Sequence, residues 1–194
     1  MKRITHLILF ILCVFAPLIG YNQLTVNNAQ TATQLAQILA GPNVIVSNAT
    51  ITGSNLASGS FDGINSNIGM SGGVILSSGD VTTAPGPNDV SNSSNNLGTG
   101  GTIQMDGLAG VATQDAITLE FDFDVQSDFI QFQYIFASEE YPEYAPPNNS
   151  SFNDVFAFFI SGPGIVGEEN IALVPGTANP VAINNINPVT NNQY

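Results

Sequence analysis

Positive charge is almost absent from this sequence of 194 residues. It contains two Lys and Arg residues in total and one His, against 15 Asp and Glu residues, for a formal net charge of −13. All three basic residues lie at the N-terminus, as Lys2, Arg3 and His6, so the rest of the chain can form no internal salt bridge. Uncompensated negative charge repels phosphate groups, which excludes nucleic acid and anionic membrane surfaces as partners. Without a basic residue or a glycine-rich phosphate-binding turn, nucleotide cofactors are not expected either.

Cysteine and tryptophan are equally scarce. The single cysteine is Cys13, so the chain can form no internal disulfide, and there is no Trp. Hydrolysis by a Ser or Thr nucleophile requires a His or Lys base, and the chain has neither after residue 22. We therefore expect a protein that is not an enzyme. A remote alternative is a glycosidase that uses carboxylates alone, for which the candidates are Glu139, Glu140, Glu143 and Asp154.

The first 22 residues have the pattern of a secretory signal peptide. The basic residues precede an apolar stretch from Leu7 to Gly20, which is too short to span a membrane comfortably. We expect cleavage between Gly20 and Gln23 and a secreted, cell-surface protein with no membrane span after the signal is removed. Residues 23–194 are long enough to bury a core, and one domain is the default for this length.

Hydrophobic periodicity after residue 23 predicts one helix followed by strands. Residues 31–40 favour a helix that buries Leu35, Ile38 and Leu39 and ends at Gly41-Pro42. The predicted strands lie at residues 44–52, 72–77, 117–125, 130–136 and 155–160, with shorter candidates at 171–174 and 181–183. Residues 79–102 read as one long loop. Many short strands joined by turns predict a mainly β fold, an antiparallel β-sandwich or jelly roll with one short N-terminal helix.

Carboxylates gather at the loop between the last two long strands. Glu139 and Glu140 follow the strand at 130–136, and Asn153 and Asp154 precede the strand at 155–160, which is apolar on both faces and expected to be central. If these strands are neighbours, both ends of the loop 137–154 meet at one edge of the sheet. An acidic stripe on the strand at 117–125 is expected to face solvent instead, at Glu120, Asp122 and Asp124.

Crowded carboxylates raise each other's pKa unless a cation intervenes, and this chain supplies none. Calcium prefers carboxylate, amide and backbone oxygens. We therefore expect Ca²⁺ at Glu139, Glu140, Asn153 and Asp154, with Asn148 and Asn149 as further oxygen donors and with Asp80 and Asp89 within possible reach from the long loop. The alternative is that one of the two Glu residues caps backbone amides while the other acids face water.

Two aromatic residues of the same loop allow two interpretations. Tyr141 and Tyr144, among several prolines, could form an exposed platform for a sugar ring. The other interpretation, which is more common for such residues, is that they pack over the loop and hold it in place.

Several motifs resemble the choice-of-anchor L domain family. The longest is FASEEYPEY followed by SSFNDVFAFFISGPG, and shorter matches are NNAQTATQL, GGVILS, DAITLEFDF, NIALVPG and VAINN. The resemblance implies an extracellular module of proteins that carry varied C-terminal anchors, often with a type IX secretion signal in the Bacteroidetes, and no established enzymatic activity. It also implies further strands after Tyr194, so we expect the domain at residues 23–194 to be incomplete at its C-terminus.

These observations together predict a secreted or cell-surface module that works in binding or adhesion. The expected partner is an extracellular glycan or a surface protein. The alternative is a passive structural spacer within a larger surface protein, with no ligand of its own.

Overall fold

Short antiparallel strands dominate the computed structural model, which describes residues 24–194 except 89, 91, 92, 94, 127 and 149–151. Strands make up 27% of the described residues and helices 13%, so the expected mainly β fold is confirmed. The proposed signal peptide lies outside the described residues. The elements in chain order are β1 Thr25–Asn27, α2 Ala32–Ala40, β2 Val44–Thr52, the 3₁₀ turn Asn55–Ala57, β3 Ser58–Asp62, β4 Gly72–Leu76, the 3₁₀ turn Val81–Thr83, α3 Ile103–Ala109, β5 Thr118–Val125, β6 Val155–Phe156, β7 Phe159–Ile160, β8 Glu169–Asn170 and β9 Val181–Ala182.

Helix α2 forms where its capping residues predict it. The Thr31 side chain accepts a hydrogen bond from the Gln34 amide, and the Gln34 side chain accepts one from the Thr31 amide, which completes a capping box. Gly41 ends the helix with a φ of +77°. The buried face differs from the expected one, because Leu35 and Ala36 are fully buried while Ile38 is 42% exposed.

Strands β2 and β5 form the longest ladder of the fold. They pair antiparallel from Val44 opposite Val125 to Thr52 opposite Thr118, with a bulge between Ser47 and Thr50. Half-buried apolar residues alternate with exposed polar ones along β5, and along β2 apart from the exposed Ile45 and the bulge. The expected solvent-facing acidic stripe is confirmed, since Glu120, Asp122 and Asp124 are all exposed.

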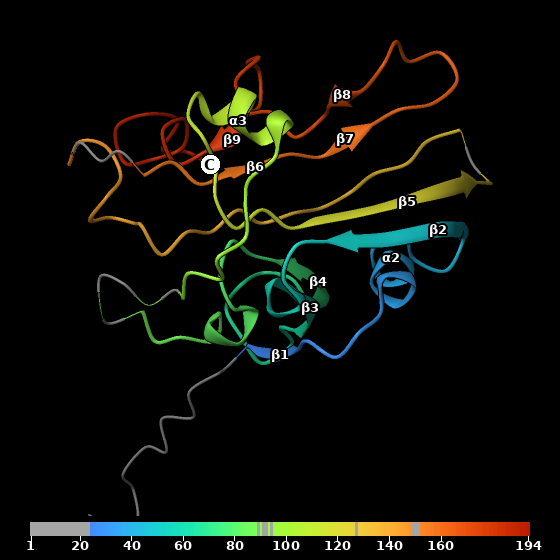
Figure 1. Cartoon of the computed structure of the whole chain (residues 1–194), viewed down its shortest axis with the longest axis horizontal. Coiled ribbons are helices and arrows are strands. Elements are labelled where there is room, and N and C mark those ends of the chain that lie inside the picture. Colours follow the sequence, from blue (N-terminus) through green and yellow to red (C-terminus); the bar gives the residue numbers. More distant parts are fainter. Residues whose placement is uncertain (1–23, 89, 91–92, 94, 127, 149–151) are drawn as a thin grey trace, which may run out of the picture.

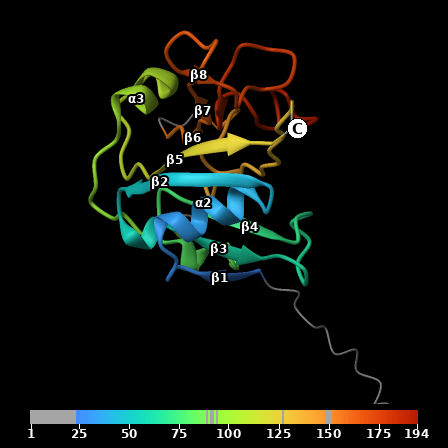
Figure 2. The same cartoon turned by 90° about the vertical axis from the view of Figure 1, so that its right-hand side faces the viewer.

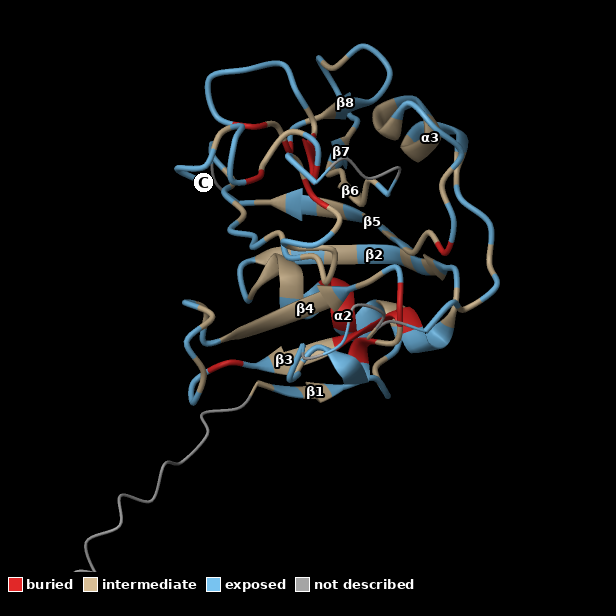
Figure 3. Ribbon diagram, turned by 90° about the vertical axis from the view of Figure 1, so that its left-hand side faces the viewer, coloured by how far each residue is buried: buried red, intermediate tan, exposed pale blue. Residues whose placement is uncertain are grey.

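The elements are stacked in layers (Figures 1 and 2). The sheet β1-β3-β4 lies on one side of the β2–β5 ladder, α2 contacts β2, β5, β3 and β4, and the tract from β6 to β9 lies on the other side with α3. Figure 3 shows buried residues around α2 and in the C-terminal tract, and further isolated ones elsewhere. The buried hydrophobic residues are Leu35, Ala36, Ala57, Val81, Ala145, Ala172, Val174, Val181, Ala182 and Ile183.

Three expectations about the second half of the chain are wrong. Residues 130–136 form no strand, although apolar residues alternate in their sequence. The expected central strand at 155–160 is split into β6 and β7, which pair with β9 and β8, and none of its residues is fully buried. The split occurs because the Asn170 side chain accepts a hydrogen bond from the Phe158 amide at 3.0 Å and replaces a backbone partner.

A second helix follows the long loop where only strands and turns are predicted. In α3, the Thr102 side chain caps the first turn by accepting from the Met105 amide, and Gly110 ends the helix in the left-handed region. Gly101, just before this helix, passes so close to Thr113 that an added Cβ would lie 2.0 Å from the Thr113 Oγ1. The loop at 79–102 is itself not featureless, because it contains the 3₁₀ turn Val81–Thr83.

Candidate functional site

The loop between residues 137 and 154 folds back on itself through short-range hydrogen bonds. The Tyr144 amide donates to the Glu140 carbonyl at 2.8 Å, and the Asn148 amide donates to the Ala145 carbonyl at 3.0 Å. The Asn148 side chain donates to the Pro142 carbonyl at 2.8 Å, and Ala145 is completely buried. The amide of Asn148 is therefore used inside the loop, and Asn149 lies outside the described residues.

Ser138 joins the two ends of this loop. Its hydroxyl donates to Oδ2 of Asp154 at 2.6 Å, and its Oγ accepts from the Glu140 amide at 3.2 Å. The carboxylates of Glu139, Glu140 and Asp154 thus lie near one another at the loop ends, and we call these three residues the acidic cluster. Sequence reasoning did not single out Ser138, although a hydroxyl directly before two acids is a common hydrogen-bond donor to a nearby carboxylate.

The surroundings of Glu140 disfavour the ionised form of its carboxyl group. Burial, then the charge of Asp154 and then that of Glu139 raise the pKa of the Glu140 carboxyl. Its Oε2 atom is buried and has no hydrogen-bond partner among the described residues. An ionised oxygen in this position is costly because it has lost water without gaining a donor.

Asn153 uses both polar atoms of its side chain in contacts with other parts of the chain. Its Nδ2 donates to the Ala109 carbonyl at the end of α3 at 3.3 Å, and its Oδ1 accepts from the Asn184 amide at 3.1 Å. A metal ion could use this oxygen only by sharing it with Asn184. In the described part of the chain, no three Asp, Glu, His or Cys side chains are arranged to hold a metal ion by themselves. A calcium ion at the cluster would therefore need amide, hydroxyl or backbone oxygens and water as well.

Tyr141 and Tyr144 both make packing contacts. The Tyr141 hydroxyl donates to the Ile186 carbonyl, and burial followed by the charge of Asp154 raises the pKa of this phenol. The Tyr144 ring meets Phe152 edge to face, with centroids 5.3 Å apart. Both tyrosines are only partly exposed. These contacts favour the interpretation that the two rings hold the loop in place.

The long loop at 79–102 reaches the acidic cluster through an amide. Asn88 Nδ2 donates to the Glu139 carbonyl at 3.4 Å, which sequence reasoning did not foresee. Asp80 instead caps the 3₁₀ turn Val81–Thr83 by accepting from the Thr82 amide and hydroxyl at 2.9 and 2.7 Å. Asp89 lies outside the described residues.

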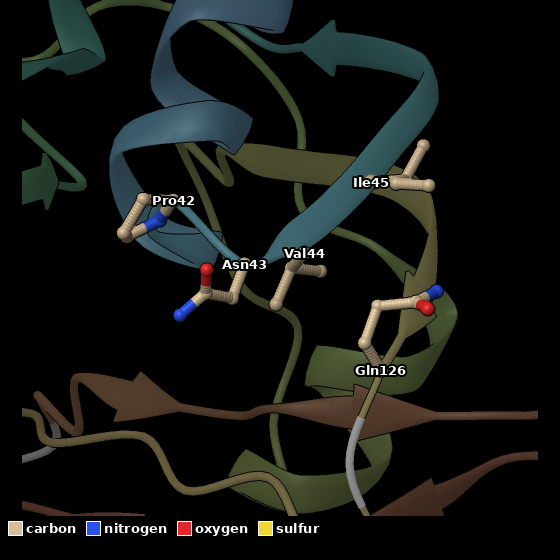
Figure 4. Close-up of a pocket in the computed structure, with 5 residues that line it drawn as sticks. All are labelled: Pro42, Asn43, Val44, Ile45 and Gln126. Carbon is tan, nitrogen blue, oxygen red and sulfur yellow. The ribbon is translucent and has the colours of Figure 1, made fainter.

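Two surface hollows lie elsewhere and are lined by no carboxylate. One is formed by Pro42, Asn43, Val44, Ile45 and Gln126 (Figure 4), where Ile45 points away from Pro42 and Val44 and is 61% exposed. The other lies beside Gly69 and Met70 and is lined by residues 132–135. Neither brings polar side chains together around a common point, so the acidic cluster remains the candidate site.

The fold and the cluster define a mainly β, antiparallel module whose loop carries partly buried carboxylates. A family model for the choice-of-anchor L domain matches residues 24–194, so the chain belongs to the choice-of-anchor L domain family. Choice-of-anchor domains are typical of extracellular or surface proteins. No curated protein and no solved structure matches the chain. Within residues 24–194 as described, no helix is long and apolar enough to cross a membrane.

Proposed function

We propose that this protein is a non-enzymatic binding or adhesion module of the cell surface, exported by a signal peptide at residues 1–22, and that Ca²⁺ at the acidic cluster stabilises its 137–154 loop. The observation that carries this proposal is the buried Oε2 of Glu140, which lacks a hydrogen-bond partner among the described residues while two further carboxylates lie nearby. A divalent cation would supply the missing positive charge. Glu140 and Asp154 would be its principal ligands, with Glu139 and Asn153 completing the expected set.

The chemistry of the chain supports calcium over a protein cation. No Lys, Arg or His occurs after residue 6, so once the proposed signal peptide is removed, the protein itself supplies no basic side chain to the cluster and neutralisation requires a proton or a cation from solution. Calcium accepts variable numbers of oxygen ligands, including waters, and extracellular modules bind it at modest affinity. The loop that it would stabilise carries the exposed side chains through which we propose contact with an extracellular glycan or a surface protein.

A passive structural spacer is the second candidate. It is favoured by the lack, among the described residues, of three acidic, His or Cys side chains set to hold a metal ion. In this case the hydrogen bond from Ser138 to Asp154 would suffice to hold the loop ends together.

A thermal melt with calcium and with a chelator separates the two candidates. At a calcium concentration 100-fold above its Kd, binding raises the free energy of unfolding by about 2.7 kcal/mol, which corresponds to a rise in Tm of roughly 5–11 °C for a domain of this size. Glu140→Gln and Asp154→Asn should lose this rise. Asp124→Asn, an exposed acid on β5, is the matched control and should keep it. A folded protein with equal Tm in calcium and in chelator would overturn the calcium site and make the spacer the leading candidate.

A further inference from the structure

Tyr134 keeps much of its surface in solvent, unlike the two tyrosines that the sequence offers as a sugar platform. The Tyr141 hydroxyl donates to the Ile186 carbonyl, and the Tyr144 ring packs on Phe152. Tyr134 is 43% exposed, and its hydroxyl makes no hydrogen bond with any described residue. An exposed aromatic ring with a free hydroxyl provides both apolar contact area and a polar group for a ligand.

The Tyr134 ring is held in place by a neighbouring aromatic residue. Its centroid lies 5.1 Å from that of Phe156, and the two ring planes are inclined at 39°. In the same segment, the Phe132 ring pairs with Phe158 at 4.5 Å. Because these contacts already restrict the rings, a ligand that stacks on Tyr134 costs little further side-chain entropy. Tyr134 therefore presents a preorganised surface.

Tyr134 lines the second of the two surface hollows, which two segments distant in the sequence form together. Gly69 and Met70 come from the segment between β3 and β4, and residues 132–135 follow β5. We call it the Tyr134 hollow. Its volume of about 370 Å³ lies within the range of small-ligand sites and suits about one or two pyranose rings. An added Cβ at Gly69 would meet nothing within 4 Å, so the backbone there is open to a ligand.

The polar groups of the Tyr134 hollow are free to bind a ligand. The Gln133 side chain is exposed and, like the Tyr134 hydroxyl, makes no hydrogen bond with a described residue. The backbone N–H and C=O groups of residues 132–135 make none with other described backbone groups. Free donors and acceptors beside an aromatic ring match a pyranose, whose C–H face stacks on the ring while its hydroxyls exchange hydrogen bonds.

The charge distribution around the hollow favours a neutral ligand. None of the lining residues is acidic or basic, whereas the whole chain has a net charge of −13. A basic peptide would be drawn to exposed acids such as those of β5, and an acidic glycan would be repelled by the chain as a whole. A purely apolar ligand would leave the Gln133 amide and the Tyr134 hydroxyl without partners. A neutral sugar satisfies both conditions.

We propose that the Tyr134 hollow binds a pyranose unit of a neutral glycan, which stacks on the Tyr134 ring and exchanges hydrogen bonds with the Gln133 side chain. This inference rests on the proposed function, from which it takes the extracellular glycan as partner, and it places that glycan at residues that directly precede the 137–154 loop. Calcium at the acidic cluster takes no part in the contact, because no carboxylate lines the hollow.

Saturation-transfer NMR titrations of the purified protein in chelator test the proposal with four neutral probes: cellohexaose, laminarihexaose, maltohexaose and mannohexaose. At least one should bind with a Kd of about 1 mM or tighter, with the strongest saturation on the ring C–H protons that stack on Tyr134. Tyr134→Ala should weaken binding on the order of tenfold, and Gln133→Ala roughly fivefold.

The chain offers a conservative variant and two matched controls. Tyr134→Phe keeps the packed ring, loses only the hydroxyl and should weaken binding roughly threefold; it serves as the test should the alanine variant fail to fold. Gln126→Ala changes an exposed glutamine of the other hollow and should leave Kd unchanged. Tyr194→Ala removes an exposed tyrosine that does not line the Tyr134 hollow, and it should also leave Kd unchanged.

The outcomes for the hollow and for the proposed function are separable. Binding that weakens in the Tyr134 and Gln133 variants but not in the controls supports the site. Four probes that all fail to bind the folded protein overturn it, as does binding of a hexalysine peptide and of no sugar, which would make a basic protein surface the partner. Sugar binding that survives these substitutions but is lost in Tyr144→Ala overturns the hollow and places the glycan on the 137–154 loop. The calcium melt is read separately in every case.

Discussion

Replacing Asp115 with asparagine perturbs the one acidic side chain that is buried among the described residues, with an exposure of 6%. Its Oδ1 accepts from the Thr99 amide at 2.6 Å and the Thr99 hydroxyl at 3.1 Å, and its Oδ2 accepts from the Leu97 amide at 2.9 Å. Its own amide donates to the Thr99 carbonyl at 2.9 Å. Asp115 therefore attaches the end of the long loop to the start of β5.

The magnitude follows from these contacts. Asparagine has nearly the same side-chain shape as aspartate and tolerates the φ of +51° at this position. Its side-chain NH₂ group, however, is a donor and would have to face a backbone N–H, which is also a donor. One charge-assisted hydrogen bond is lost, and one donor is left buried without an acceptor. Together these changes lower the free energy of unfolding by about 3 kcal/mol. For a domain of this size, that lowers Tm by roughly 6–12 °C. Asp124→Asn, on the exposed face of β5, is the matched control and should change Tm by little.

The pH dependence gives a second, independent check. Burial raises the pKa of Asp115, but hydrogen bonds from Thr99, Leu97 and Gly98 outweigh it, so the pKa in the folded protein lies below its ordinary value. A depressed pKa contributes stability above the unfolded value of about 3.9, and this contribution is lost as the pH falls through the folded pKa. The Tm difference between Asp115→Asn and the unsubstituted protein should thus be full at pH 6 and shrink below pH 4. A difference that is negligible at pH 6, or constant down to pH 3, would refute the reasoning.

Two further substitutions test the packing around the site. Gly101→Ala should lower the free energy of unfolding by about 1–3 kcal/mol, because its Cβ would lie 2.5 Å from the Thr113 carbonyl oxygen. Gly100→Ala is the control, since an added Cβ there would meet nothing within 4 Å. Equal denaturation midpoints for the two variants would contradict the contact. Tyr141→Phe removes the donor to the Ile186 carbonyl and should cost about 1 kcal/mol in urea unfolding; an unchanged midpoint would show that the ring alone holds the loop.

Local sequence signals predict the first half of the fold well. The helix at 32–40 follows from Thr31 and Gln34 at its start and Gly41 at its end, all within a few residues. The predicted strand at 44–52 coincides with β2, and that at 117–125 nearly coincides with β5, because alternating apolar residues specify a half-buried strand. Thr102 and Gly110 likewise stand at the start and the end of α3. The residues between them lack the apolar periodicity of a helix, so the sequence did not predict α3.

The same signals fail where a distant side chain decides the outcome. The alternation at 130–136 predicts which residues share a face, but it carries no information about whether a neighbouring backbone completes the hydrogen bonds. The division between β6 and β7 depends on Asn170, which is twelve residues away from Phe158. Asn153 looks like an oxygen ligand from its neighbours in sequence, yet its amide is occupied by Ala109 and Asn184, 44 and 31 residues away. Sequence proximity therefore identifies the carboxylates of the site but not the partners that complete it.

The acidic side chains of this chain are stabilised in different ways, and this difference singles out the acidic cluster as the candidate functional site. One set of acids is neutralised in effect by donors from the backbone, and it comprises Asp62, Asp80, Asp106 and Asp115. A second set lies on the exposed face of β5, where solvent reaches the acids and Asp122 also accepts from Asn48 Nδ2 at 2.6 Å. Glu140 has neither solution, because its Oε2 is removed from water and receives no hydrogen bond from the described residues. The described residues include no Lys, Arg or His. Without a basic neighbour, such a group is kept by protonation, by separation from other carboxylates or by an ion from solution, and each of these makes the 137–154 loop responsive to its surroundings.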